Sequence, residues 1–299
     1  MQKFTDALLR QFRLNRSRNL LHTDVERLLE IDPTFLAALE DLLADPAAAA
    51  ALQGDALAEQ AAATLVERIY AVNQYIQVDE RTRQRLKDIY VASWQELIES
   101  RDIEGTLRGF HYPRIQAVLE GLYPPALKEA LRRIPTVNEV PCSEYSPALQ
   151  LQLFRLDPVT LRQPLLDVGC GSRAQLVRYL RSQGVEAHGI DRSLKVTAPY
   201  LTEIDWFAYR FEPGRWGTIL ANLSFTNHFV YAEHYDLGAA KRYPAKYREI
   251  LESLAPGGNF LYAPNAPLLE AGIVDMESQI ERWSISTGHA VTRIETSEV

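Results

Sequence analysis

The feature that most constrains this chain is an apolar run that ends in an acid and is followed at once by two glycines. Residues 164–168 read Pro-Leu-Leu-Asp-Val, then come Gly169, Cys170 and Gly171, and a helical segment covers 174–181. Glycine at these positions lets the backbone turn sharply and lets a ligand approach without a Cβ atom in the way. The sequence therefore predicts a buried strand, a ligand-binding turn and a helix.

Short apolar runs alternate with helical segments in the rest of the second half. We expect further strands at 185–190, 217–223 and 258–262, and helices at 174–183 and 243–254. This alternation is typical of a parallel sheet with helices on both faces, whose right-handed crossovers bring the loops after the strands to one edge. The predicted fold class is α/β, with ligands bound at that edge.

The order of elements after Tyr262 stays open. A helix from 267 to about Trp283, followed by a strand over 289–295, competes with a hairpin that turns at 286–288. Both arrangements place a strand near the end of the chain.

The first half has the periodicity of an all-helical unit. Asp32-Pro33 is typical of a helix start, and the alanine run 47–51 has high helix propensity. The candidates for burial are Leu28, Leu29, Phe35, Leu36, Leu39, Leu42, Leu43, Ile69, Tyr70, Val72, Ile76, Leu86, Ile89, Tyr90, Trp94, Leu97 and Ile98. Repeated prolines from 124 to 147 break the pattern and indicate a linker. We therefore expect a helical domain over 1–140 and an α/β domain over 141–299.

Composition limits the class of partner. The 299-residue chain has a formal net charge of -7 and a pI of about 5.5, and its densest basic groups, at 132–133 and 241–248, are mixed with acids or apolar residues. Such a chain repels a phosphate backbone, so we expect no nucleic-acid partner. Two cysteines give no disulfide framework, the amino terminus lacks the apolar core of a signal peptide, and no apolar run approaches the roughly twenty residues that cross a bilayer. We expect a cytoplasmic protein with no membrane partner.

A second acid follows the glycine turn at the spacing of a nucleoside-binding site. The predicted strand 185–190 leads into Asp191, where a carboxylate can accept hydrogen bonds from both ribose hydroxyls. Gly169, Gly171 and Ala174 also satisfy the looser dinucleotide-binding pattern, so an NAD(P)-dependent oxidoreductase is an alternative. Asp167 favours a different ligand, because a buried carboxylate repels pyrophosphate and needs a polar partner such as a cationic amino-acid group.

Several of these segments, in the same order, resemble class I S-adenosylmethionine-dependent methyltransferases, a Rossmann-like family. Residues 165–171 resemble the first motif of that family, and 189–191 resemble the acid at the end of its second strand. Residues 219–225 resemble the fourth strand with its loop, and 254–261 resemble the L-x-P-G-G turn into the fifth strand. The resemblance implies a Rossmann-like sheet and S-adenosylmethionine as the methyl donor.

The resemblance also implies which residues hold this cofactor. Contacts are expected from Asp167, Gly169, Cys170, Gly171, Asp191, Arg192, Asp205, Trp206 and Asn222. In that arrangement the glycine turn holds the methionine part and Asp191 holds the ribose. Asp205 accepts a hydrogen bond from the adenine amine, and the backbone of Trp206 faces the adenine ring.

Catalytic groups are expected in the segment from Asn222 to His234, which we predict as a polar loop after the fourth strand. His228 is the first candidate for a general base or an acceptor-orienting group, because histidine titrates near neutrality, although a packed core histidine is the alternative. Asn222 is a second candidate, and Tyr145 is placed to touch the methionine part of the donor. The sequence Asn-Leu-Ser-Phe at 222–225 differs from the Asn-Pro-Pro-Tyr of many amino-group methyltransferases.

These observations predict methyl transfer to an acceptor whose identity the residues do not specify. Charge favours a small molecule, with a peptide or protein as the next choice, and no metal site is expected. The helical domain is expected to cover or shape the acceptor pocket, with His111 and Tyr112 either lining it or packing at a helix end. A third alternative is a non-catalytic donor-binding protein whose helical half binds another protein.

Overall fold

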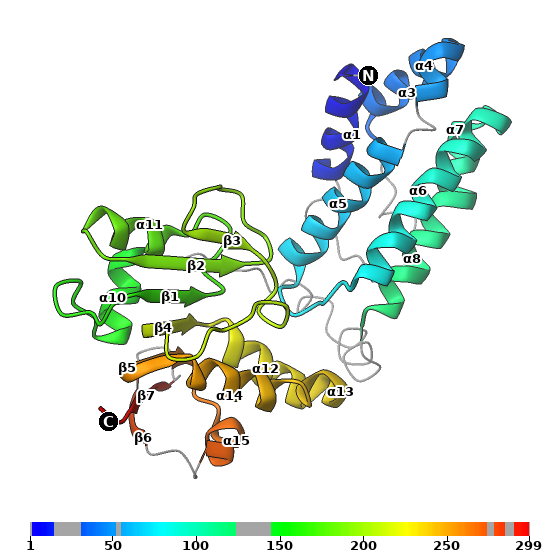
Figure 1. The fold of residues 1–299 in the computed structure, drawn as a ribbon. Helices are drawn as coiled ribbons and strands as arrows, with labels where there is room; N and C mark the ends of the chain where they lie inside the picture. Colours follow the sequence, from blue (N-terminus) through cyan, green and yellow to red (C-terminus); the bar gives the residue numbers. More distant parts are fainter. Residues whose placement is uncertain are drawn as a thin grey trace. The chain divides into compact units, whose positions relative to one another are not determined.

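The computed structural model describes residues 2–14, 31–51, 55–123, 145–273, 278–284 and 290–298. The chain divides into two compact units, Met1–Cys142 and Ser143–Val299, which we call the helical unit and the α/β unit (Figure 1). The expected boundary near residue 140 and most of the proline-rich linker lie outside the described residues. Within those ranges, no helix combines the length and the apolar character that crossing a bilayer requires.

The described part of the helical unit contains helices and no strands. Its elements are α1 (Gln2–Leu14), α3 (Pro33–Ala44), α4 (Pro46–Ala51), α5 (Asp55–Val72), α6 (Glu80–Ser100), α7 (Ile103–Gly105), the π-helical turn η1 (Thr106–His111) and α8 (Tyr112–Gly121). The helix start predicted at Asp32-Pro33 is confirmed, since the Asp32 carboxylate accepts a hydrogen bond from the Thr34 amide at 2.7 Å. Asp79 caps α6 in the same way, through the Thr82 amide.

Aromatic and aliphatic side chains from several helices form the core of this unit. Phe4 of α1 contacts both Phe35 of α3 and Trp94 of α6, with ring centroids about 6 Å apart (6.0 and 5.9 Å). Most predicted core residues are buried: Phe35, Leu39, Leu42, Leu43, Ile69, Tyr70, Ile76, Leu86, Ile89, Tyr90, Trp94 and Leu97. Leu36 and Ile98 are only partly buried, while Leu28, Leu29 and the side chain of Val72 lie outside the description.

The α/β unit is built on one seven-stranded sheet with the order β3-β2-β1-β4-β5-β7-β6. The strands are β1 (Leu165–Val168), β2 (Ala187–Asp191), β3 (Leu201–Glu203), β4 (Trp216–Asn222), β5 (Leu254–Ala263), β6 (Ser278–Ser284) and β7 (Ala290–Thr296). The first five pair in parallel, whereas β7 pairs antiparallel with both β5 and β6. The chain order reverses between β1 and β4, so this is a topological switch point, where open α/β sheets bind ligands.

Helices cover both faces of the sheet (Figure 1). The helices are α10 (Pro147–Phe154), α11 (Gln175–Ser182), α12 (Phe225–Tyr235), α13 (Leu237–Ala240), α14 (Tyr243–Glu252) and α15 (Pro267–Glu270), with a 3-10 turn at Ala271–Ile273. One face packs Leu165, Leu220 and Leu261 against α10 and α11, and the other packs alternate residues such as Leu166 and Ile219 against α12 and α14. The predicted α/β fold class is therefore confirmed.

Two sequence predictions about this unit are corrected by the structure. The segment Asn222–His234 is not a loop, because α12 begins at Phe225 and buries Phe225, Phe229 and Ala232 at helical spacing. The long helix from 267 to about Trp283 is also wrong. After the short α15, residues 278–284 form β6 and pair with β7, as the hairpin alternative predicted, although its turn lies outside the described residues.

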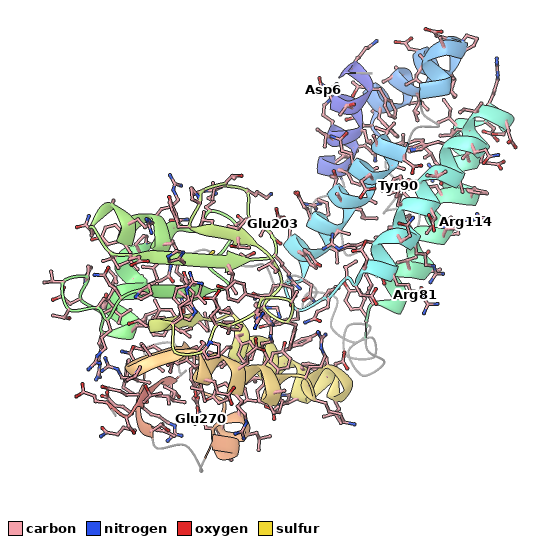
Figure 2. All side chains as sticks on the ribbon, in the orientation of Figure 1. Asp6, Arg81, Tyr90, Arg114, Glu203 and Glu270 are labelled. Carbon is pink, nitrogen blue, oxygen red and sulfur yellow. The ribbon has the colours of Figure 1, made fainter. Side chains whose placement is uncertain are left out.

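A buried carboxylate joins the short helix α15 to the sheet. Glu270, labelled in Figure 2, lies at the end of α15 and accepts hydrogen bonds from the Tyr262 hydroxyl at 2.8 Å and the Thr292 hydroxyl at 3.0 Å. It also accepts from the Ala266 amide and from the Arg282 guanidinium. These contacts tie α15 to β5, β6 and β7 across 8 to 22 residues, which is further than the spacing of a helix pattern.

Candidate functional site

The candidate site lies where β1, β2 and β4 end at the same edge of the sheet. Asp167 pairs in register with Gly189 on β2 and with Leu220 on β4. Side chains alternate between the two faces of a strand. Asp191 lies two residues after Gly189, and Asn222 lies two residues after Leu220, so both lie on the same face as Asp167. The fold thus gathers two acids and an amide on the face that α10 and α11 cover.

The glycine turn follows directly and needs glycine at both positions. Gly169 and Gly171 have φ angles of 78° and 79°, a region that other residues rarely adopt. A Cβ atom on Gly169 would lie 2.5 Å from the Cβ atom of Ser224. The Ser224 hydroxyl donates to the Val168 carbonyl oxygen at 2.6 Å, so the chain after β4 packs tightly against the turn.

The amides of the turn already have partners within the protein. Gly169 and Cys170 both donate to the Ile190 carbonyl oxygen, at 2.8 and 3.1 Å, and Gly171 donates to Asp191 Oδ2 at 3.0 Å. A dinucleotide-binding turn must instead aim its N–H groups at the pyrophosphate. At these three positions the turn offers an anion no free donor.

Two backbone amides hold the carboxylate of Asp191 in one orientation. Its Oδ2 atom accepts from the Gly171 amide, and its Oδ1 atom accepts from the Ser193 amide at 2.8 Å. Asp191 is the last residue of β2 and is partly exposed at the edge where Asp167 and Asn222 also lie. Its carboxylate is therefore a fixed acceptor at the candidate site.

Asp167 is buried, with 3% of its surface exposed, and its carboxyl group has no hydrogen-bond partner among the described residues. Burial, and secondarily the negative charge of Asp191, raises the pKa of Asp167 to about 7. A buried polar group without a partner costs free energy unless a ligand engages it. The position and the acceptor character of this group point to a ligand that donates hydrogen bonds or carries positive charge.

Asp205 and Trp206 follow β3 and differ in accessibility. Asp205 is partly exposed, and its Oδ1 atom accepts from the Phe207 amide at 2.8 Å, which leaves Oδ2 available to a ligand. Trp206 is buried, and its ring packs edge-on against His228 with the centroids 4.9 Å apart. Its indole N–H has no hydrogen-bond partner in the described part of the chain. The Trp206 ring is thus part of the core.

His228 is also a core residue by its surroundings. It is 6% exposed and lies on α12 against Trp206. Burial, and secondarily the positive charge of nearby Arg192, holds the pKa of His228 well below its usual value. The imidazole is therefore neutral at pH 7, and these properties are those of the packed core histidine considered as the alternative.

The structure adds one polar residue that the sequence analysis did not single out. Gln150 of α10 is buried, donates from Nε2 to the Tyr145 carbonyl oxygen at 2.9 Å and accepts at Oε1 from Asn222 Nδ2 at 3.1 Å. It lies one helical turn before the core residue Phe154, a spacing that could have marked it as inward-facing. The Tyr145 side chain makes no hydrogen bond within the described ranges, so its predicted contact with the donor stays a prediction.

Two other residues named in the sequence predictions, Cys170 and His111, lie in different units. Cys170 is partly buried, and its Sγ atom fills the space where a Cβ atom on Gly189 would lie, 2.8 Å away, which suits a packing role. His111 belongs to the helical unit, where Nδ1 lies 2.8 Å from the Ser93 hydroxyl. In the described residues, no group of three or more His, Cys, Asp or Glu side chains could hold a metal ion.

Comparison with models of protein families and with curated proteins finds no match. Among solved structures, the chain is similar to the N-methyltransferase NodS from Bradyrhizobium japonicum WM9, with 15% identity over 50% of this chain and 96% of that one and a TM-score of 0.36. It is also similar to an S-adenosylmethionine-dependent methyltransferase from Bacteroides fragilis in complex with S-adenosyl-L-homocysteine, with 17% identity over 48% of this chain and 77% of that one and a TM-score of 0.34.

A third similar structure is 1,6-didemethyltoxoflavin-N1-methyltransferase from Burkholderia thailandensis, with bound 1,6-didemethyltoxoflavin and S-adenosylhomocysteine. It has 15% identity over 44% of this chain and 70% of that one, with a TM-score of 0.30. Because these identities and TM-scores are low, the ligand has to be inferred from the site itself. The strand order, the helices on both faces and the glycine turn establish that Ser143–Val299 is a Rossmann-like α/β unit with a polar site at its switch point.

Proposed function

We propose that the α/β unit binds S-adenosylmethionine and transfers its methyl group to an acceptor molecule. The observation that carries the proposal is the acceptor character of the glycine turn. Three turn amides donate within the protein, and the buried Asp167 carboxyl group beside them has no partner among the described residues. Such a turn suits the ammonium group of an amino acid and disfavours the phosphates of NAD(P).

The remaining groups of the donor have matching residues along the same edge. Asp191, whose carboxylate is fixed by the Gly171 and Ser193 amides, is placed to accept from the ribose hydroxyls, and Asp205 Oδ2 suits the exocyclic amine of adenine. Asp167 and Asp191 lie at the ends of β1 and β2, and Asp205 follows β3; these three strands are neighbours in the sheet. A nucleoside with a cationic amino-acid tail therefore fits the order of groups better than a dinucleotide does.

The donor supplies a sulfonium methyl group that a nucleophile can displace in line. Such a displacement depends mainly on alignment, and a base is needed only when the acceptor must lose a proton. Two hydrogen bonds fix the connector Asn222–Ser224, which suits such an alignment. The Leu223 amide donates to the Ala263 carbonyl oxygen at 2.8 Å, and the Ser224 hydroxyl donates to the Val168 carbonyl oxygen. A base role for His228 stays a prediction that its burial and lowered pKa disfavour. The net charge of -7 favours a small-molecule acceptor over a nucleic acid.

Calorimetry with the full chain tests the proposal. We expect binding of S-adenosylhomocysteine and none of NAD or NADP. Asp191→Asn should weaken that binding by about 10- to 100-fold, or 1 to 3 kcal/mol, because two charged hydrogen bonds to the ribose are lost. Glu203→Gln is the matched control, since exposed Glu203 pairs with Asp191 in register on the edge strand β3 (Figure 2). Tighter binding of NAD than of S-adenosylhomocysteine would contradict the proposal.

A further inference from the structure

The buried amide of Gln150 has its orientation fixed by the backbone. A carbonyl oxygen can only accept, so the atom of Gln150 that faces the Tyr145 carbonyl oxygen must be Nε2. The other end of the same amide, Oε1, therefore faces Asn222. This order does not depend on how the two ends of the amide are assigned, because the reverse order would bring two acceptors together.

The orientation of Asn222 follows from that of Gln150. Since Gln150 Oε1 can only accept, Asn222 must present Nδ2 to it, at 3.1 Å. The Asn222 Oδ1 atom is then turned away from Gln150, and it has no hydrogen-bond partner in the described part of the chain. Asn222 is partly exposed at the end of β4, so this acceptor is accessible to a ligand.

The free acceptor of Asn222 shares a sheet face with the unpartnered carboxyl group of Asp167. Leu220 pairs with Asp167 in register, and Asn222 is the next residue of β4 on that face. Two acceptors that have no donor among the described residues, on neighbouring strands, form a place for a group with several N–H donors. An ammonium group has three donors and no acceptor.

We propose that Gln150 is a positioning residue that holds the Asn222 amide with its carbonyl oxygen toward the ligand, so that the site selects the ammonium group of the donor's amino-acid part. The inference rests on the proposed function and extends it to a residue of α10 that need not touch the ligand. The helix itself is anchored at its other end, because Trp283 Nε1 donates to the Leu153 carbonyl oxygen at 2.9 Å. The helix that carries Gln150 is therefore fixed in place.

The test compares two ligands that differ only in the amino-acid part. S-Adenosylhomocysteine carries the ammonium group, whereas 5′-methylthioadenosine keeps the adenosine and the thioether without it. We expect Gln150→Leu to weaken binding of S-adenosylhomocysteine by about tenfold, and Gln150→Lys to weaken it further, because a donor at position 150 turns the Asn222 NH2 group toward the ligand. Binding of 5′-methylthioadenosine should change by less than about twofold in both variants, whereas general damage to the fold would weaken both ligands.

Two further variants complete the design. Gln150→Glu keeps an acceptor toward Asn222 but loses the donor to the Tyr145 carbonyl oxygen, so it should weaken binding of S-adenosylhomocysteine less than Gln150→Lys does. Gln152→Leu, on the exposed side of the same helix, should leave both ligands unaffected. If the leucine variant does not fold, Gln150→Met, which fills a similar volume, takes its place.

The outcomes separate this proposal from the proposed function. A wild-type chain that binds neither ligand overturns the proposed function. The wild-type chain is expected to bind S-adenosylhomocysteine more tightly than 5′-methylthioadenosine. If the ratio of these two affinities stays the same in the leucine and lysine variants, only the role of Gln150 is overturned. The role of Gln150 is supported if the ratio of the affinities for S-adenosylhomocysteine and 5′-methylthioadenosine falls in both of those variants and falls less in Gln150→Glu than in Gln150→Lys.

Discussion

Two buried carboxyl groups in the α/β unit have opposite surroundings. Asp167, at the end of β1, is 3% exposed and has no hydrogen-bond partner among the described residues, and its pKa is raised to about 7 by burial and by Asp191. Glu270, on α15, is 4% exposed and accepts hydrogen bonds from four residues. Burial alone would raise the pKa of Glu270, but hydrogen bonds led by that from Arg282 outweigh it, so the pKa lies below its usual value.

The two acids are equally buried, so the difference between them lies in their hydrogen-bond donors. Glu270 stabilises the fold as an anion, because its donors come from the protein itself. Asp167 destabilises the fold when it ionises, because no described residue donates a hydrogen bond to it. A destabilised group kept at the switch point of the sheet is the expected mark of a binding site.

The largest expected effect is on stability when Glu270 is changed. Glu270→Gln should lower the free energy of unfolding by about 3 kcal/mol, because it leaves buried donors imperfectly paired. Chemical denaturation of the full chain at pH 7 measures this change, with Glu281→Gln on the exposed side of β6 as the control. A loss below about 1 kcal/mol would remove the contrast with Asp167.

The next effect concerns stability and pH at Asp167. The folded-state pKa of about 7 lies above the ordinary value of 3.8, so the carboxyl group costs stability increasingly as pH rises between these values, and the full cost is present above pH 7. Asp167→Asn removes that cost. The difference in unfolding free energy between the variant and wild type should therefore increase by roughly 2 kcal/mol from pH 5 to pH 8. Denaturation at the two pH values without ligand measures the gain, and a pH-independent difference would contradict the comparison.

The smallest expected effect is on the pH dependence of ligand affinity at Asp167. Asp167 must ionise to hold an ammonium group, so wild-type affinity for S-adenosylhomocysteine should fall by about tenfold between pH 8 and pH 6. Asp167→Asn should bind this ligand more weakly at pH 8 and show little dependence on pH, whereas 5′-methylthioadenosine should bind equally at both pH values. Calorimetry at pH 6 and pH 8 distinguishes these outcomes. Equal pH dependence for both ligands would place the titrating group elsewhere.

Local patterns determined the elements that carry the candidate site. The apolar run before Gly169, the glycine turn, the helix after it and the acid at Asp191 are all set by neighbouring residues and by which backbone angles glycine allows, and each was predicted within a few residues. The α/β fold class followed from the alternation of such elements. The helix start at Asp32 was predicted for the same reason, since capping is a contact between residues two or three apart.

Contacts between distant residues decided the rest, and no local pattern contains them. Gln150 and Asn222 are separated by 72 positions, and their hydrogen bond exists only because α10 packs over the end of β4. Whether a buried acid such as Asp167 or Glu270 meets donors depends on which strands and helices surround it, and residues 278–284 became a strand because β7 offered a partner. The sequence by itself determined where the chain turns and which residue types reach the sheet edge. Only the tertiary structure decided which of those groups are satisfied by the protein and which are left for a ligand, because hydrogen bonding and burial depend on the packing of the whole unit.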